Sequence, residues 1–366
     1  MKISILLPYK ENFSTEYAGA VSLLLKDIIP LSKYKKFINI YGSTYYKKNI
    51  LKKKYINLKL NNFFFQSKSN SYIKKFIEHE NKKKSDIIEI HNRPIYVNKL
   101  YKVNKNLVLY FHNDPLQTKG SISINERINL LKKTKKIIFI SKWVKSRFSK
   151  GINKKYLLKN KFDIIQHSTN KKKVDFKKKE KIILFVGRLN KSKGYDIFGN
   201  AIIKILNKYH NWKSIVVGDE PRDKLQYNHQ KLNNLGFLKH NEVLNIYKKT
   251  SIAVVCSRWE EPFGRTSLEA AANGCAVIIS DRGGLKETIT NGIILKKLDQ
   301  INLYREIENL IINYKKRTNL QKLSIKNFYL THSYISKLID NVRDQKFRLI
   351  KKFNINKKIS LRILHV

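Results

Sequence analysis

The sequence predicts an α/β protein with two parallel-sheet domains. Short apolar runs alternate with longer amphipathic or polar segments along the first half of the chain, which is the pattern of βαβ units and a parallel sheet. After about residue 180 the same rhythm begins again. At 366 residues the chain also exceeds what one hydrophobic core usually serves, so two domains are expected.

Each expected strand is a short apolar run that ends at polar residues. In chain order these runs are Lys2–Leu7, Phe37–Tyr41, Asp86–Ile90, Leu107–Phe111, Lys136–Ile140, Asp163–Ile165, Lys181–Val186, Lys213–Val217, Asn234–Phe237, Ile252–Cys256 and Cys275–Ser280. The lysine-rich stretch Asn170–Glu180 has no apolar period and is the expected linker. Ser333–Ile350 is amphipathic and predicts a long helix, while residues 351–366 fit a helix, an edge strand or a tail. The predicted domains are therefore 1–170 and 171–332, followed by a C-terminal helix and tail in 333–366.

The formal net charge of +49 has two explanations that the sequence leaves open. Lysine tracts are scattered along the whole chain and Asn, Ile and Tyr are enriched, a profile that resembles translation of an AT-rich genome. Alternatively, the charge is selected for an acidic partner surface. Either origin gives a surface that attracts anionic lipid head groups, so peripheral contact with an anionic membrane is compatible with both.

No apolar run approaches the ~20 residues that a membrane span requires. Ile3–Leu7 is too short for a signal-peptide core. Cys256 and Cys275 are the only cysteines, which fits a reducing compartment and argues against disulfides or a cysteine metal site. We therefore expect a cytoplasmic protein.

Two carboxylates, Glu261 and Glu269, stand eight positions apart in the stretch EPFGRTSLE. The apolar run Ser251–Ser257 before them predicts a buried parallel strand, and Thr266–Asn273 predicts a helix that Gly274 ends. A strand end followed by a helix N-terminus is where α/β proteins bind anions, because free backbone N–H groups point there. The turn is a candidate site for a diphosphate.

Glu269 also has a structural explanation. Thr266 and Glu269 match a capping box, in which a hydroxyl and a carboxylate satisfy each other's backbone donors at a helix start. Glu261 precedes Pro262 in a loop that has no capping use for it. We therefore expect Glu261 to take part in the chemistry and leave both roles open for Glu269.

Several polar residues follow predicted strands at the rim where open α/β sheets bind ligands. They are His91 with Asn92, Arg93 and Pro94; His112 with Asn113, Asp114 and Pro115; Ser141; and His167. A single histidine at a strand end is more often structural than functional, but several on one rim favour a cleft. His112 is the strongest candidate, because the turn predicted at 113–115 fixes it at the sheet edge.

The segment Phe185–Gly194 runs from a strand into a loop, and a helix is expected from about Tyr195. Arg188 and Lys193 lie over the start of that helix, one a planar fork suited to phosphate oxygens and the other a compact charge. The spacing matches neither an ATPase phosphate loop nor the dinucleotide fingerprint. Their position between glycines at a strand–helix junction makes both residues candidates for phosphate binding.

These residues resemble the retaining nucleotide-sugar glycosyltransferases of family GT4, whose GT-B architecture has two Rossmann-like domains facing each other across a cleft. The resemblance covers Pro8 to about Val342. Its motifs are Phe185-Val-Gly-Arg-Leu, Lys193-Gly194, Leu235-Gly-Phe-Leu, Glu261-Pro-Phe-Gly through Glu269-Ala-Ala-Ala-Asn-Gly, Asp281-Arg-Gly-Gly-Leu-Lys-Glu287 and, more loosely, Tyr17–Val21, Phe111-His112 and Phe139–Trp143. The chain departs from the family at Gln166–Thr169, where many members have an Asn-Gly pair before the interdomain linker.

The resemblance implies a donor site chiefly in the second domain. Arg188 and Lys193 would bind the diphosphate, Glu269 the ribose hydroxyls, and Glu261 with the backbone of 263–265 the sugar hydroxyls. The implied set comprises catalytic Glu261 and His112, and donor-binding Gly19, Arg188, Lys193, Phe263, Gly264, Arg265, Thr266 and Glu269. The final helix would cross back to the first domain.

The charges suggest the mechanism. Breaking a sugar–phosphate bond leaves positive charge on the ring and negative charge on the diphosphate, so fixed cations are useful at the phosphate. The chain contains no Asp-x-Asp, so a metal ion has no evident ligands. The resemblance implies a retaining, metal-independent hexosyl transfer in which the leaving phosphate is the base, and no cofactor beyond the nucleotide sugar.

The predicted function is transfer of a sugar from a nucleotide-diphosphate sugar to a saccharide or lipid-linked acceptor, in cell-envelope polysaccharide or lipopolysaccharide synthesis. UDP-sugar and GDP-sugar donors both fit the motifs. A nucleotide-sugar epimerase is the alternative with the same architecture, and it would need no acceptor. A basic nucleic-acid-binding protein is more distant, because neither a recognition helix nor a stacking platform is recognisable.

Overall fold

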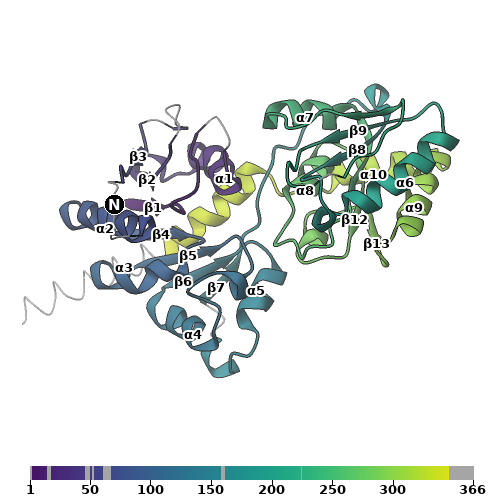
Figure 1. Ribbon diagram of the computed structural model, residues 1–366. Coiled ribbons are helices and arrows are strands. Elements are labelled where there is room, and N and C mark those ends of the chain that lie inside the picture. The colour runs from purple at the N-terminus through teal and green to yellow at the C-terminus, as the bar shows by residue number, and fades with distance from the viewer. Residues whose placement is uncertain are drawn as a thin grey trace, which may run out of the picture.

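The computed structural model describes residues 2–14, 18–45, 50–51, 53–60, 67–157, 161–223 and 225–345. Within these ranges the chain forms two sheets, one of seven strands in the order β3-β2-β1-β4-β5-β6-β7 and one of six in the order β10-β9-β8-β11-β12-β13. Every strand pair in both sheets is parallel. Figure 1 shows the two sheets as separate units that lie side by side, each flanked by helices. The predicted α/β fold with two parallel sheets is confirmed.

The N-terminal half builds the seven-stranded sheet. Its strands are β1 (Ile3–Leu6), β2 (Ile38–Gly42), β3 (Tyr55–Asn57), β4 (Ile87–His91), β5 (Leu107–Phe111), β6 (Lys136–Phe139) and β7 (Phe162–Ile164). Its helices are α1 (Ala20–Ile28), α2 (Lys68–Lys82), α3 (Val97–Val103), α4 (Ile124–Lys133) and α5 (Lys142–Ser149).

The C-terminal half builds the six-stranded sheet. Its strands are β8 (Glu180–Val186), β9 (Lys213–Val217), β10 (Leu232–Asn234), β11 (Thr250–Val255), β12 (Ala276–Ser280) and β13 (Ile293–Leu295). Its helices are α6 (Tyr195–Lys208), α7 (His240–Lys249), α8 (Arg265–Ala272), α9 (Gln300–Ile312) and α10 (Tyr314–Lys326). A further helix occupies residues 332–345.

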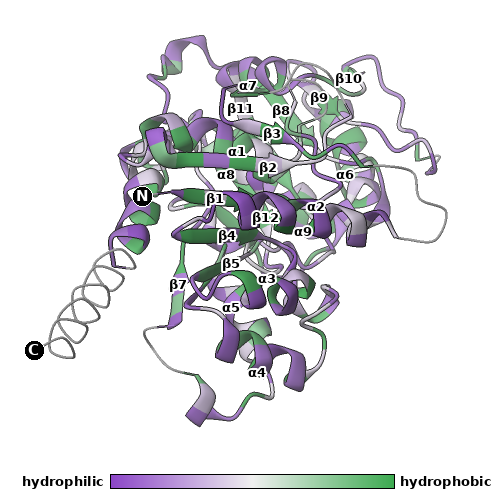
Figure 2. Cartoon of the chain, turned by 90° about the vertical axis from the view of Figure 1, so that its left-hand side faces the viewer, coloured by the Kyte–Doolittle hydropathy of each residue, from purple (hydrophilic) through white to green (hydrophobic). Residues whose placement is uncertain are grey.

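The central strands explain the apolar runs in the sequence. Every residue of β4, β5 and β12 is buried. Parallel strands are covered on both faces, so neither face has to be polar. Figure 2 shows β4 and β5 in hydrophobic green, while the helices carry much of the hydrophilic purple.

One predicted strand is placed wrongly and two are missed. The run Asn234–Phe237 was expected to be a strand, but β10 ends at Asn234, because Gly236 turns the chain at φ 61° and its N–H bonds to Asn234 Oδ1 at 3.1 Å. The expectation missed β3 and β13, three-residue strands at sheet edges. Strands this short give no alternation that a sequence pattern can reveal.

Residues 170–179 contain one short 3₁₀ turn and no other regular element, and β8 begins at Glu180. The helix at 332–345, yellow in Figure 1, lies against the N-terminal half. There Asp340 accepts a hydrogen bond from Ser32 at 2.6 Å, and Arg343 bonds to both oxygens of Glu89 at 2.7 and 2.8 Å. The expectations for 351–366 lie outside the described residues, and the domain boundaries at 170 and 332 stay predictions.

Two further observations concern the described part of the chain. None of its helices combines the length and apolar composition that a membrane span needs. Cys256 and Cys275 are both buried and free, Cys256 directly after β11 and Cys275 directly before β12.

The ion pair between Arg343 and Glu89 joins the last described helix to β4 in a buried place, since the two side chains are 3% and 2% exposed. We expect Arg343→Met to lower the free energy of unfolding by about 3 to 5 kcal/mol, because it leaves Glu89 charged and buried without its partner. The matched control is Lys33→Met, which breaks an exposed pair with Asp344 on the same helix and should cost under about 1 kcal/mol. Urea unfolding followed by circular dichroism measures both, and equal losses would contradict the prediction.

Candidate functional site

The turn between β11 and α8 forms the centre of the candidate site. Gly264 is the residue before the helix and has a left-handed backbone, with φ 116° and ψ 84°. A Cβ at this position would lie 2.5 Å from Leu285, so only glycine fits without a shift. Helix α8 therefore starts at Arg265, one residue earlier than predicted, and its N-terminus has no side-chain cap.

The capping-box prediction for Thr266 and Glu269 is thus wrong. Thr266 lies inside the first turn of α8, since Gly264 occupies the capping position. Instead, Glu269 Oε1 accepts hydrogen bonds from Arg265 Nη2 and His240 Nε2, both at 2.8 Å. Burial alone would raise the pKa of Glu269, but Arg265 and His240 outweigh it and hold that pKa below its usual value. Glu269 is therefore a buried carboxylate that stays charged.

The loop between β8 and α6 brings Lys193 to Glu261. Asn190 Oδ1 accepts a hydrogen bond from the Lys193 backbone N–H at 3.1 Å, which shapes a short turn that ends at Gly194 in a left-handed conformation. Lys193 Nζ pairs with Glu261 Oε1 and lies 4.7 Å from the ring centre of Trp259. Glu261 is only 8% exposed. Two residues selected from separate motifs are thus in direct contact.

These side chains border a small cavity of about 130 Å³. Its lining consists of Phe185, Val186, Gly187, Lys193, Val255, Ser257, Glu261, Gly264, Arg265 and Thr266. Arg265 Nη1 is buried there without a hydrogen-bond partner among the described residues. Arg188 is exposed beside Gly187, and within the described ranges its side chain has no hydrogen bond or ion pair. Lysine, arginine and glutamate thus meet at one cavity where β8 and β11 end.

The edge of the N-terminal sheet is arranged differently from the prediction. Gly19 precedes α1, but the carboxylate of Glu11 lies so close that a Cβ on Gly19 would be 2.2 Å from Glu11 Oε1. Ser22 N–H donates to the same oxygen at 2.9 Å. Burial raises the pKa of Glu11, although hydrogen bonds from the α1 N-terminus oppose this. A side chain that the sequence did not single out therefore occupies the space beside Gly19, which was expected to bind the donor, and Tyr17 of that motif lies outside the described residues.

The three strand-end histidines are linked in a row. His91 Nδ1 lies 3.0 Å from His112 Nε2, and His112 Nδ1 lies 3.1 Å from His167 Nε2. Burial lowers the pKa of His91 to about 3 and, with help from neighbouring groups, lowers the pKa values of the other two well below 6.5. The rings are therefore neutral at neutral pH. The sequence predicted that each histidine follows a strand. It did not predict the row, because the contacts join residues 21 and 55 positions apart.

The row reaches the C-terminal half through aromatic contact. The His167 ring lies 6.0 Å from the ring of Phe263 in the turn before α8. His91 Nε2 and His167 Nδ1, the two outer nitrogens, have no hydrogen-bond partner among the described residues. Both nitrogens of His112 are taken by the other two rings, so its own N–H or lone pair is not free for a ligand in this arrangement.

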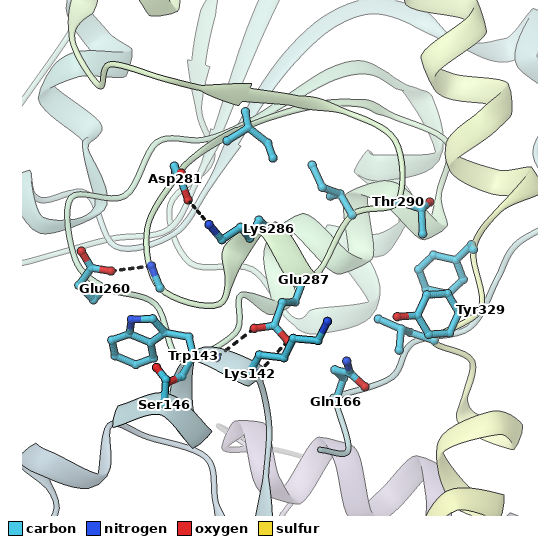
Figure 3. A pocket seen from close by; sticks show the side chains of 15 residues that line it. Lys142, Trp143, Ser146, Gln166, Glu260, Asp281, Lys286, Glu287, Thr290 and Tyr329 are labelled. Atoms are coloured by element: carbon cyan, nitrogen blue, oxygen red, sulfur yellow. Dashed lines mark hydrogen bonds and ion pairs between the residues drawn. The ribbon is translucent and has the colours of Figure 1, made fainter. Parts of the chain in front are cut away.

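The two halves also meet at the start of α5. Ser141 Oγ donates to the Pro262 carbonyl at 2.6 Å, and Glu287 accepts the backbone N–H groups of Lys142 and Trp143 at 2.8 and 3.2 Å. Figure 3 shows Glu287 between these residues at the edge of a cavity of about 890 Å³ that lies between the halves. The sequence identified Ser141 as a rim residue, but Glu287 only as part of a loop motif.

The segment Gln166–Thr169, which leads from the first half to the second, contacts residues 330–332, where the chain returns to the first half. Thr169 N–H bonds to the Leu330 carbonyl at 3.1 Å, and Ser168 Oγ lies 2.9 Å from His332 Nδ1.

Within the described residues no group of three or more His, Cys, Asp or Glu side chains is arranged to hold a metal ion.

Comparison with known proteins identifies the family. Residues 166–326 match the family model described as "Glycosyl transferases group 1". Spore coat protein SA of Bacillus subtilis is 25% identical over 361 residues, covering 88% of this chain and 93% of that protein.

The fold is similar to those of several solved structures. HepE of Anabaena, in complex with UDP-glucose, matches with a TM-score of 0.70 at 17% identity, over 94% of this chain and all of that one (100%). WaaG, described as a glycosyltransferase involved in lipopolysaccharide biosynthesis, matches with a TM-score of 0.65 at 14% identity, over 93% and 99% of the two chains. The motifs around Lys193, Glu261 and Glu269 lie within residues 166–326, which belong to the group 1 glycosyltransferases, family GT4, and the solved structures show that the chain has the GT-B fold.

Proposed function

We propose that the chain transfers a hexose from a nucleotide-diphosphate sugar to a saccharide or lipid-linked acceptor, with retention of anomeric configuration and without a metal ion. The proposed setting is cell-envelope polysaccharide or lipopolysaccharide synthesis, in the cytoplasm at the inner face of the membrane. UDP-glucose in HepE supports the donor class, and the role of WaaG supports the setting. The net charge of +49 supports peripheral contact with anionic lipids.

The contact between Lys193 and Glu261 carries this proposal. The bond that breaks lies between the diphosphate and the sugar ring, so a site for this reaction needs a cation at the phosphate and an acceptor at the sugar next to each other. Lys193 and Glu261 supply that pair at the wall of one cavity. A diphosphate that binds Lys193 would replace Glu261 in this ion pair, and the Glu261 carboxylate would then accept hydrogen bonds from the sugar hydroxyls.

The remaining donor contacts are assigned from the same geometry. Arg188 is the exposed cation at the rim, and Arg265 Nη1 is a buried donor without a partner among the described residues. The hydrogen bonds that Glu269 accepts from Arg265 and His240 end on Oε1, so we assign Oε2 to a ribose hydroxyl. The first backbone N–H groups of α8 have no partners within the helix, so those of Arg265 and Thr266, together with the N–H groups of Phe263 and Gly264 in the turn before it, are assigned to phosphate or sugar oxygens.

Two residues of the N-terminal half must change partners in this mechanism. Glu11 has to leave the N-terminus of α1 before a phosphate can reach Gly19. A sugar hydroxyl that bonds to His112 has to replace one of the two imidazole rings that contact it. We assign the replaced contact to His167, because the His167 ring lies against Phe263 in the turn before α8. In this proposal the leaving phosphate takes the acceptor proton, so front-face attack needs no carboxylate nucleophile.

The function is tested by incubating the protein with UDP-hexoses and GDP-hexoses, with and without saccharide acceptors, and measuring free nucleotide. Nucleotide released only when an acceptor is present supports the transferase. Interconversion of the sugar without any acceptor would instead identify an epimerase.

Arg188→Ala should weaken the binding of UDP or GDP, whichever the protein prefers, roughly 10- to 100-fold, because a charge-assisted bond to phosphate is lost. The melting temperature should not change, since Arg188 is exposed. The matched control is Lys191→Ala, an exposed lysine in the adjoining turn. Calorimetric titration measures the affinities, and equal affinity in the two variants would remove Arg188 from the donor site.

The Glu269 assignment predicts two separable effects. Glu269→Ala should lower the free energy of unfolding by about 3 to 5 kcal/mol because Arg265 loses its buried partner, whereas Glu269→Gln keeps an acceptor and should cost less. The wild type should bind UDP more tightly than 2′-deoxy-UDP or 3′-deoxy-UDP, and Glu269→Gln should reduce this difference in affinity. A preference that survives in the Gln variant would mean that Glu269 does not hold the ribose.

The neutral histidines predict how stability depends on pH. In the unfolded chain histidine takes a proton near pH 6.5, whereas His91 in the folded protein does so only near pH 3. The unfolded state therefore binds more protons in this window, and stability falls as the pH is lowered from about 6.5 towards 3, by up to about 1.4 kcal/mol per pH unit for His91. Unfolding free energies measured across this range should show a shallower slope for His91→Gln than for wild type, and equal slopes would contradict the prediction.

A further inference from the structure

A second cavity lies beside the proposed donor site. It has a volume of about 380 Å³ and is lined by Asp114, Gln117, Trp143, Arg147, Trp259 and Glu260. The first four belong to the N-terminal half, on the turn after β5 and on α5, and the other two belong to the loop after β11. The two halves therefore share this cavity, and none of its lining residues is used in the proposed donor contacts.

Trp259 separates this cavity from the donor site. Lys193 lies on the Trp259 ring at 4.7 Å, and Lys193 also pairs with Glu261. The backbone N–H of Trp259 donates to the Ser192 carbonyl at 3.0 Å, so the turn that carries Lys193 also fixes this tryptophan. A molecule in the cavity is thus one indole ring away from the proposed diphosphate contact.

The lining has the chemistry of a sugar site. Indole rings offer flat apolar faces for the C–H groups of a pyranose, and amide and carboxylate oxygens accept its hydroxyls, which matches the general pattern of aromatic walls with a few polar anchors. Trp259 is 38% exposed and Gln117 is exposed, so both have free surface. In Figure 3 the Trp143 indole lies next to Glu260, which also lines the larger cavity.

The charges in the lining favour an uncharged ring. Arg147 already bonds to both oxygens of Asp114, at 2.8 to 3.2 Å. Glu260 accepts from Gly283 N–H at 2.6 Å and from Arg282 at 3.2 Å. Among the residues that the structure describes, the lining includes no lysine, in a chain with 76 lysines and arginines. A phosphate or carboxylate on the ligand would therefore meet paired carboxylates instead of a free cation.

We propose that this cavity binds the acceptor, and that the part of the acceptor held there is an uncharged hexose ring stacked between Trp143 and Trp259. The proposal rests on the proposed transferase function, which it extends from the donor to the acceptor. It places the acceptor hydroxyl on the side of Trp259 that faces Glu261.

Tryptophan fluorescence provides a direct test, because the chain has three tryptophans and two of them line the cavity. The third, Trp212, is 3% exposed and packs in the core of the C-terminal half. The full chain, with UDP present, is titrated with methyl glycosides of glucose, galactose, mannose and N-acetylglucosamine, and with glucose 6-phosphate. At least one uncharged glycoside should change the emission saturably and bind at least about tenfold more tightly than glucose 6-phosphate.

Substitutions of the three tryptophans test which of them contacts the glycoside. Trp143→Ala and Trp259→Ala should each weaken glycoside binding at least about tenfold, measured by calorimetry so that the probe itself is not lost, whereas Trp212→Phe should keep wild-type affinity. Unchanged affinity in both alanine variants, no saturable response to any uncharged glycoside, or tighter binding of the phosphorylated sugar would overturn the proposal. Calorimetric binding of UDP is followed in parallel. If the wild-type protein binds UDP but no uncharged glycoside, only the acceptor site is refuted, whereas absent nucleotide binding by the wild type refutes the proposed function itself.

Discussion

The close approach of two loops at Gly194 and Cys256 organises the candidate site. A Cβ on Gly194 would lie 1.8 Å from the Cys256 carbonyl oxygen, so the backbones touch at a distance that no other residue allows. This contact follows from the pairing of β8 with β11, whose carboxyl ends lie side by side. It fixes Lys193 on one loop against Glu261 and Trp259 on the other. The donor and acceptor proposals both depend on it.

The charged residues of the site are matched to one another inside the protein. Lys193 pairs with Glu261, Arg265 with Glu269, and the N-terminus of α1 with Glu11. A buried charge without a partner costs several kcal/mol, so these pairings keep a strongly basic chain from placing isolated cations in its interior. In the proposed function, binding of a diphosphate would therefore amount to an exchange of anionic partners.

The fold and the motif positions could be predicted from the sequence because both depend on local patterns. Buried parallel strands are continuous apolar runs, and Gly194 and Gly274 mark the turn before α6 and the end of α8 as expected. The capping box failed because Gly264, two residues before the predicted helix start at Thr266, takes a left-handed conformation that only tertiary contact with Leu285 makes evident. Glu11, Glu287 and the histidine row escaped prediction for a related reason. Their roles depend on which distant residues the fold brings to them.

The row of histidines has a consequence for where its protons can lie. A neutral imidazole carries one N–H, and the two contacts join Nδ1 of one ring to Nε2 of the next, from His91 through His112 to His167. Any mixture of tautomers would set N–H against N–H or lone pair against lone pair. All three protons therefore lie on Nδ1, or all three lie on Nε2. A group that bonds to the outer nitrogen of His167 would decide the tautomer of His91 two rings away, and the information would cross the sheet edge as a shift of protons with no movement of the backbone.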